Sequence, residues 1–252
     1  MGFDDKRVLL TGGAGALGTL VAKRMLSEGA HVTIVDRAEG TPLDASYLQG
    51  DLSTTAGIAA ITEKIGAEPW DILVNLAGIQ YFGPFAAQST PNIEATYMVN
   101  LVAPSLIAHA VLPAMIARGR GQIVNIGSVF GSINFAHFVT YSSSKAGLAG
   151  LSQALRRELA GTGVGVTYIA PRAVNTPLSS ESIRRFAKLI NMPLDNPYVV
   201  AARIVRAIAR RERDVYIGFP EAFFVRINAI LPRIVDVALA GADKKARELF
   251  IN

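Results

Sequence analysis

Short apolar runs alternate with longer amphipathic segments along the whole chain. The runs are rich in aliphatic and β-branched residues, which favours buried strands, and the segments between them carry apolar residues at helical spacing. Strands are predicted at Arg7–Leu10, His31–Val35, Ile72–Leu76, Gln122–Ile126, Val164–Ile169 and Val215–Ile217. Helices are predicted at Ala16–Glu28, Ser53–Ile65, Pro91–Arg118, Tyr141–Ala160 and Pro197–Arg211.

Apolar strands separated by helices are typical of a parallel sheet that is buried on both faces. We therefore predict an α/β fold in which residues 1–252 form a single domain, a doubly wound (Rossmann-type) parallel β-sheet of about seven strands flanked by helices. Two segments depart from this plan. Residues 177–197 are a loop-rich insertion, interpreted as a lid, and residues 219–252 form a C-terminal extension past the last strand.

The composition of the 252 residues narrows the class of protein. Half of the chain is apolar and 18% is charged, which excludes global disorder. The absence of cysteine excludes disulfides, thiolate nucleophiles and cysteine metal sites, and we predict no metal site. Residues 1–5 lack the basic and apolar segments of a secretory signal. We expect a cytoplasmic protein.

A long run without Asp, Glu, Lys or Arg is Ala95–Ala117. Its length is sufficient to span a bilayer, which takes about 20 apolar residues. Because the run contains Asn100, Pro104, His109 and Pro113 and lies in the middle of the chain, we predict a buried core helix or an interface helix.

The net charge of +5 is concentrated near the C-terminus, where residues 182–252 carry 13 Lys or Arg against 7 Asp or Glu. Solvated helix faces explain these clusters. Neither a contiguous basic stripe with aromatic stacking nor a recognised module is present, so we predict no nucleic-acid binding. The alternative is attraction of the C-terminal tail to an anionic membrane surface.

The glycine-rich turn after the first strand is the first candidate for chemistry. It fits both G-x-G-x-x-G and T-G-x-x-G-x-x-G and comprises Thr11, Gly12, Gly13, Ala14, Gly15, Ala16, Leu17 and Gly18. Small residues let a strand turn sharply into a helix and let the backbone approach a pyrophosphate, and the helix N-terminus offers N–H groups to phosphates. The turn therefore predicts a dinucleotide site; the alternative is a glycine turn without a ligand.

Asp36 ends the second predicted strand and bears on which dinucleotide binds. A carboxylate there accepts hydrogen bonds from the adenosine ribose and repels a 2′-phosphate, which favours NAD over NADP. Arg37 follows directly. It could face a phosphate, stack on adenine or be an ordinary solvated arginine. We predict NAD as the cofactor, with NADP as the alternative.

Tyr141 and Lys145 are four residues apart, which places them on one face of a predicted helix. A nearby ammonium and a positively charged nicotinamide favour the phenolate, so we expect the pKa of Tyr141 to lie below its usual value of about 10. Tyr141 could then exchange a proton with a substrate oxygen. Ser128 follows the strand Gln122–Ile126, so it lies at the same sheet edge as the glycine-rich turn.

With these motifs in order, the sequence resembles the short-chain dehydrogenases/reductases of the compact, single-domain type. The resemblance covers residues 6 to about 218. It rests on Thr11–Gly18, Asp36, Asp51-Leu52, Asn75-Leu76-Ala77-Gly78, Asn100, Ser128, Tyr141-x-x-x-Lys145, and Pro171 with Thr176. It implies an oxidoreductase that binds NAD(P) and forms a homodimer or homotetramer through the helices at 91–118 and 141–160.

The resemblance also implies a role for each matching residue. Tyr141 is implied as general acid/base and Ser128 as the partner of the reacting oxygen. Lys145 is implied to bind the nicotinamide ribose and lower the pKa of Tyr141, and Asn100 to hold a relay water. Cofactor-binding residues, including those of the glycine-rich turn, are Gly12, Gly13, Gly15, Ala16, Leu17, Gly18, Asp36, Arg37, Asp51, Leu52, Asn75, Ala77, Gly78, Tyr141, Lys145, Pro171, Val174 and Thr176.

Three features depart from the family pattern. Ala16 stands where compact members have a glycine, and we expect binding to survive its extra methyl group. Arg172 replaces the glycine that usually follows Pro171; it could favour an acidic substrate group, but we expect it to point to solvent. The connection from Arg37 to about Ser46 leaves little room for the usual helix.

The predicted substrate residues are Ser128, Phe130, His137 and Tyr141. If the aromatic segment before Tyr141 and the apolar lid both line the pocket, the substrate is apolar and bulky, such as a lipid, steroid-like or aromatic ketone or alcohol. The alternatives are that these side chains pack on each other and that His137 is only a loop residue.

We therefore predict an NAD(P)-dependent oxidoreductase that interconverts a secondary alcohol and a ketone. The alternative is a catalytically silent, dinucleotide-binding regulatory protein of the same fold, against which the presence of Ser128, Tyr141 and Lys145 argues. For Phe219–Ala240 three interpretations stay open: contact with a membrane surface, burial against a partner subunit, and capping of the pocket.

Overall fold

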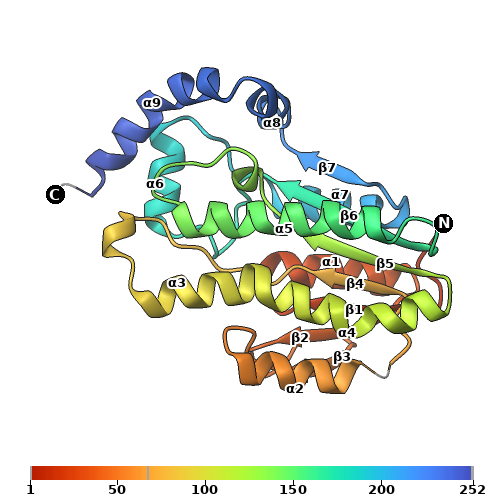
Figure 1. Cartoon of the computed structure of the whole chain (residues 1–252). Helices are drawn as coiled ribbons and strands as arrows, with labels where there is room; N and C mark the ends of the chain where they lie inside the picture. Colours follow the sequence, from red (N-terminus) through yellow and green to blue (C-terminus); the bar gives the residue numbers. More distant parts are fainter. Residues whose placement is uncertain (1, 67, 251–252) are drawn as a thin grey trace.

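Seven strands form one sheet in which every neighbouring pair is parallel. The computed structural model describes residues 2–66 and 68–250. The strand order is β3-β2-β1-β4-β5-β6-β7 (Figure 1). The strands are β1 (Arg7–Thr11), β2 (His31–Asp36), β3 (Ser46–Gln49), β4 (Ile72–Asn75), β5 (Gly121–Ile126), β6 (Val164–Pro171) and β7 (Asp214–Ile217). The prediction of a doubly wound parallel sheet is confirmed.

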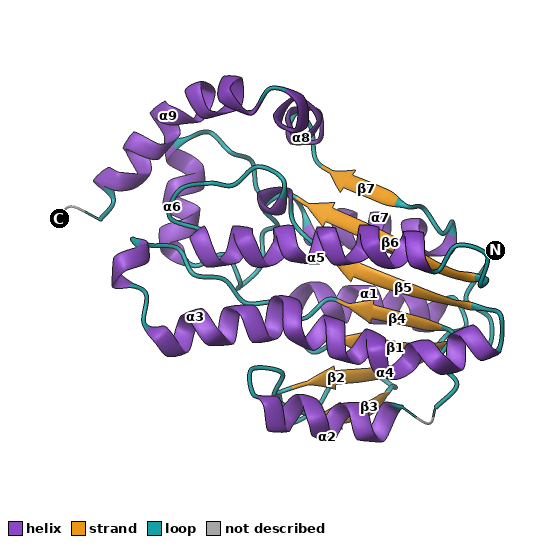
Figure 2. Ribbon diagram, viewed as in Figure 1, coloured by secondary structure: helices purple, strands orange, loops and turns teal. Residues whose placement is uncertain are grey.

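Helices cover both faces of this sheet. Helices α1 (Ala16–Ser27) and α7 (Pro197–Ala209) lie together on one face, while α2 (Thr55–Ile65), α4 (Ala103–Ala117) and α5 (Val139–Glu158) cover the other (Figure 2). The strand side chains alternate between the two cores: Val8 and Leu10 pack with α1 and α7, and Leu9 packs with α2 and α4. This alternation is why strands buried on both faces are apolar at every position.

The long helix predicted at 91–118 is interrupted. Helix α3 (Thr90–Tyr97) passes through a π-helical turn, η2 (Met98–Val102), into α4. In the described part of the chain one helix, Thr90–Ala117, is long and apolar enough to cross a membrane by length and composition alone, and 44% of its most apolar window is buried in the protein. Ile107, Val111 and Met115 pack against the sheet, as predicted for a core helix.

The remaining elements gather around the carboxyl ends of the strands and at the C-terminus. As expected, residues 37–45 connect β2 to β3 without a helix. The lid segment forms α6 (Glu181–Leu189), and the C-terminal extension forms α8 (Glu221–Ile230) and α9 (Pro232–Glu248), which contacts α6 (Figure 1). Two short 3₁₀ turns are η1 (Phe85–Ala87) and η3 (Val129–Gly131). Residues 251–252 of the predicted extension lie outside the described residues.

Candidate active site

A cavity of about 880 Å³ lies at the carboxyl ends of the central strands. Ligands of doubly wound sheets bind at this edge, where the strand order reverses and helix N-termini converge. Its lining combines the glycine-rich turn, the ends of β2 and β4, the start of α5 and the segment after β6. The predicted residues that line it are Gly12, Gly15, Ala16, Leu17, Gly18, Asp36, Arg37, Asp51, Leu52, Ala77, Gly78, Ser128, Phe130, Tyr141, Lys145, Pro171, Val174 and Thr176.

At Gly12 and Gly18 the glycine-rich turn packs too tightly against other backbone atoms for a side chain. Gly12 has a φ of +73°, and a Cβ on it would meet the Ala77 backbone at 2.6 Å. A Cβ on Gly18 would lie 2.1 Å from the Gly12 carbonyl oxygen. The Thr11 hydroxyl accepts hydrogen bonds at 3.2 Å from the N–H groups of Leu76 and Ala77, which fixes the turn after β4 against the turn after β1.

The cavity walls fit a dinucleotide. Helix α1 begins after Gly15 without a side-chain cap, and its first turn holds no acidic residue, so amide N–H groups are open to a phosphate. The Asp36 carboxylate is held by the N–H groups of Ala14, at 3.0 Å, and Ala38, at 3.2 Å, and it lines the cavity. Ala16 is exposed and lines the cavity, so its methyl group has room.

Asp51 lies on the same wall as Asp36. A hydrogen bond from the Ser53 backbone N–H, 2.8 Å from its carboxylate, lowers the pKa of Asp51. Asp36 and Asp51 both line the cavity, where hydroxyl groups of an adenosine ribose can donate hydrogen bonds to their carboxylates.

Ser128, Tyr141 and Lys145 meet at the other end of the cavity. Ser128 caps η3 by accepting a hydrogen bond from the Phe130 N–H at 3.1 Å, and it lines the cavity together with Tyr141. The Lys145 ammonium donates to the Ile126 carbonyl oxygen at 2.9 Å and lies 6.0 Å from the centroid of the Tyr141 ring. The i, i+4 spacing on α5 thus brings phenol and ammonium to one side of the helix.

Burial sets the protonation of this cluster. It lowers the pKa of Lys145 to about 8. It raises the pKa of Tyr141, and the hydrogen bond with Ser128 opposes this increase. The sequence predicts a pKa below the ordinary value for Tyr141, and the protein alone does not have it. Burial withdraws the phenolate from water, and this effect outweighs the hydrogen bonding that favours the phenolate. A positively charged group that binds in the cavity would lower the pKa of Tyr141.

Asn100 organises the cluster from behind the cavity wall. It lies in the π-helical turn η2 and is fully buried. Its side-chain oxygen accepts from the Ile79 N–H at 2.9 Å, while its amide donates to the Ile79 carbonyl at 2.9 Å and to Ser144 at 3.0 Å. A Cβ on Gly78 would lie 3.4 Å from the Asn100 oxygen and 3.5 Å from the Lys145 nitrogen. Both distances are ordinary contacts, and they show that the Asn100 oxygen and the Lys145 nitrogen both lie beside Gly78.

Three other predicted residues also lie away from the cavity. Gly13 is buried, and a Cβ there would meet Ile34 at 2.7 Å, so it serves packing of α1 on β2. Asn75 is buried and donates to Asn125 at 2.8 Å. The ring of His137 lies 5.0 Å from that of Phe250, and burial lowers its pKa. These residues position neighbours of the cavity.

Arg172 lines the cavity and does not point to solvent. Its guanidinium forms a bidentate pair with Asp195, at 2.9 and 2.6 Å, and donates to the Phe219 carbonyl oxygen at 2.8 Å. The two side chains are only 11% and 19% exposed. The expectation was wrong because Asp195 and Phe219, distant in sequence, both lie beside the end of β6. Arg172 joins β6, the end of the lid and the start of the extension.

The substrate end of the cavity is apolar. Phe130, Phe138, Ile183 and Met192 line it near Tyr141. Behind them, Phe186 and Ala246 complete a buried cluster, so the aromatic residues partly line the cavity and partly pack on each other. Phe138 and Met192 belong to the two apolar segments that were expected to line the pocket, and Ile183 is a lining residue that the sequence analysis missed. The Ile126 carbonyl oxygen was also missed, because every residue has such a backbone atom and no sequence pattern marks it.

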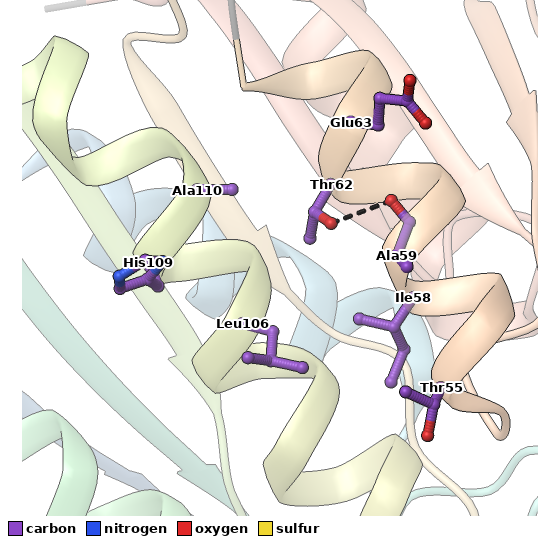
Figure 3. A pocket seen from close by; sticks show the side chains of 8 residues that line it. All are labelled: Thr55, Ile58, Ala59, Thr62, Glu63, Leu106, His109 and Ala110. Carbon is purple, nitrogen blue, oxygen red and sulfur yellow. Dashed lines mark hydrogen bonds between the residues drawn. The ribbon is translucent and has the colours of Figure 1, made fainter.

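A second hollow, of about 450 Å³, lies between α2 and α4. Figure 3 shows Ile58, Leu106 and Ala110 beside it, while His109 and Glu63 point away from one another on the two helices. The only hydrogen bond drawn joins the Thr62 hydroxyl to the Ala59 carbonyl within α2. Its lining brings no reactive groups together, so the larger cavity is the candidate active site.

Comparisons with known proteins agree with this geometry. The sequence pattern of the short chain dehydrogenase family matches residues 6–185. A ketoacyl reductase, HetN, from Nostoc sp. is 32% identical over 84% of this chain and 78% of its own. Human estradiol 17-beta-dehydrogenase 11 is 30% identical over 89% of this chain and 79% of its own.

Among solved structures, a short-chain dehydrogenase from Sphingobium yanoikuyae in complex with NADPH is 25% identical and superposes with a TM-score of 0.75, covering 93% of this chain and 95% of that one. The family's sequence pattern spans the glycine-rich turn, Ser128, Tyr141 and Lys145. With the parallel sheet and the cavity at its carboxyl edge, these findings show that the chain belongs to the short-chain dehydrogenase/reductase family of NAD(P)-binding oxidoreductases.

Proposed function

We propose that the protein interconverts a secondary alcohol and a ketone with Tyr141 as the general acid/base. The observation that carries this proposal is that Ser128, Tyr141 and Lys145 line the apolar end of a cavity whose other end is the glycine-rich turn. A substrate oxygen that meets both hydroxyls lies within reach of proton transfer, and the substrate carbon faces the rest of the cavity.

The bound dinucleotide supplies the acceptor or donor of a hydride. In the direction of oxidation, Tyr141 takes the proton of the substrate hydroxyl while the carbon loses a hydride and the C–O bond becomes a carbonyl. Ser128 donates to the reacting oxygen and stabilises its developing charge. Lys145 binds the nicotinamide ribose and, while protonated, favours the Tyr141 phenolate. Asn100 holds the Ile79 turn and leaves space beside Lys145 for a relay water.

The substrate we propose is apolar and bulky. The end of the cavity at Tyr141 is lined by Phe130, Phe138, Ile183 and Met192, and such a wall stabilises hydrocarbon far better than charged groups. Two relatives are named as a ketoacyl reductase and an estradiol 17-beta-dehydrogenase, and these names support the same class.

We propose NAD as the preferred cofactor. The two backbone N–H groups that hold Asp36 fix its carboxylate on the cavity wall, where a 2′-phosphate would meet a like charge. Arg37 also lines the cavity and offers the opposite charge, so the ratio of kcat/KM for NAD and NADP decides between them.

We further propose a cytoplasmic homo-oligomer assembled through α4 and α5. Leu106 and Ile116 on α4 and Val139 on α5 are each more than 40% exposed in the single chain. Apolar side chains of this size on neighbouring helices favour burial against a second copy.

The test is turnover of a panel of secondary alcohols and ketones of increasing apolar size, followed through nicotinamide absorbance with NAD and with NADP. We expect the highest kcat/KM for a bulky apolar substrate with NAD. Tight dinucleotide binding without turnover of any panel member would favour the silent regulatory alternative.

A further inference from the structure

The two C-terminal helices carry a concentration of exposed apolar side chains. Ile230 and Val237 are 77% and 78% exposed, and Phe223 is 54% exposed. The outer face of α8–α9, as we call it, consists of Phe219, Phe223, Phe224, Ile230, Leu231, Ile234 and Val237. Large apolar clusters of this kind mark interaction surfaces on soluble proteins.

The inner sides of the same helices are packed, so the exposure belongs to the folded protein. Val225 and Val235 are buried with Val129 and Ile133. The Asn228 amide donates to the Ser132 carbonyl oxygen at 2.7 Å. In Figure 1, α8 and α9 lie along one border of the molecule, beyond β7.

Basic residues interrupt the apolar rows at helical spacing. On α8, Phe223, Arg226 and Ile230 are all exposed at positions i, i+3 and i+7, which share one face. On α9, Arg233, Val237 and Lys244 are exposed at i, i+4 and i+11, with the exposed Asp236 at i+3. In the described part of the chain, neither Arg226 nor Arg233 forms an ion pair. Apolar side chains with interspersed cations are typical of helices that lie in a membrane interface.

We propose that the outer face of α8–α9 docks on the surface of an anionic phospholipid bilayer. Phe223, Ile230 and Val237 enter the boundary between headgroups and acyl chains, and Arg226 and Arg233 bind lipid phosphates beside them. A second copy of the chain fits this surface less well, because a protein interface would desolvate Arg226 and Arg233, whereas lipid phosphates supply their counter-charge.

The docking surface is joined to the active site through α9. Ala246, near the end of α9, is buried in the cluster that contains Phe130, Phe138 and Tyr141, and the Lys245 ammonium donates to the Leu189 carbonyl of α6 at 3.3 Å. A bilayer bound on α8–α9 therefore lies next to the lid of an apolar cavity. The docking itself does not depend on the proposed reaction.

The experiment is flotation of the full-length protein with vesicles of equal parts phosphatidylglycerol and phosphatidylcholine, compared with pure phosphatidylcholine. We expect flotation with the anionic vesicles and a loss of it at high salt. The Arg226→Glu/Arg233→Glu variant should bind at least about 25-fold more weakly, because each basic residue near such a surface contributes about 1 kcal/mol. The Ile230→Ser/Val237→Ser variant should also lose flotation.

Matched controls lie on another side of the molecule. Arg206→Glu/Arg210→Glu reverses two exposed arginines in and after α7, and Tyr198→Ser/Val199→Ser removes two apolar side chains that are 64% and 65% exposed. Both controls should float like the wild type, and circular dichroism should show all variants folded. Equal loss in test and control variants, or absence of flotation with anionic vesicles, overturns the proposal. The proposal is also overturned if an α8–α9 variant floats like the wild type but has a lower mass in analytical ultracentrifugation, since that result assigns the face to a second copy.

Discussion

The Gly18→Ala substitution tests the part of the structure that we expect to hold the dinucleotide. Gly18 lies in the first turn of α1, and a Cβ there would be 2.1 Å from the Gly12 carbonyl oxygen and 2.8 Å from the Gly13 Cα. Ordinary contact begins near 3.4 Å. All the atoms in the way belong to the backbone, so the glycine-rich turn must move away from α1 by more than an ångström.

Overpacking of this kind costs about 1–3 kcal/mol, and a clash with fixed backbone belongs at the upper end. Replacement of a helical glycine by alanine returns up to about 1 kcal/mol of helix propensity. The net loss is about 2 kcal/mol, which corresponds to a decrease in Tm of about 4–8 °C for a chain of this length. Because the displaced amides face the cavity, we expect dinucleotide affinity to fall about tenfold or more.

Gly150→Ala is the matched control. Gly150 is an exposed glycine in α5, and a Cβ there meets nothing within 4 Å, so this variant should keep its affinity and gain slightly in Tm. Calorimetric titration with NADH and thermal unfolding measure both quantities. If Gly18→Ala matches Gly150→Ala in Tm and in Kd, the tight turn is not what shapes the binding site, and the reasoning is refuted.

Two further predictions concern stability. Asp195→Asn should lower the free energy of unfolding by about 2 kcal/mol, since it removes the carboxylate that pairs with the largely buried Arg172. Glu212→Gln acts on the more exposed pair with Arg203 and should lower it by less than about 1 kcal/mol. Equal decreases for the two variants in urea-unfolding experiments would contradict this ranking. Burial lowers the pKa of Lys145 to about 8, so between pH 8 and 10 the unfolded chain binds more protons at this residue than the folded protein does. The stability of the wild type relative to Lys145→Met should therefore increase as pH rises. A stability difference that stays constant from pH 7 to 9.5 would show that Lys145 does not titrate in this way.

The elements that could be predicted from the sequence are those whose buried positions recur at regular spacing. Strands such as β1 and β5 are apolar at consecutive positions, and helices such as α1 show one buried stripe, so local pattern and tertiary burial agree. β3 was not delimited because Ser46–Gln49 is half-exposed at the sheet edge and has only one aliphatic residue. The interruption at Met98–Val102 was missed because its cause is the set of hydrogen bonds from Asn100 to the distant Ile79 turn.

The site could be predicted where chemistry demands a residue type at a fixed spacing. The glycine-rich turn and the Tyr141–Lys145 pair are of this kind, and they line one cavity. Residues whose neighbours come from elsewhere in the chain could not be placed. The pair of Arg172 with Asp195, the packing of His137 on Phe250 and the position of α9 over the aromatic cluster arise from contacts between distant segments, which periodicity does not encode.

The central claim is that Tyr141 exchanges a proton with the substrate oxygen. The measurement that tests it most directly is kcat of Tyr141→Phe on the best alcohol of the panel, followed at the nicotinamide absorbance band, with NADH affinity determined by titration of the same preparation. Loss of general acid/base catalysis should lower kcat about 10²–10⁴-fold. NADH affinity should stay within about tenfold of the wild type, because the phenol contributes at most one hydrogen bond to the dinucleotide. A Tyr141→Phe protein with wild-type kcat would contradict the account.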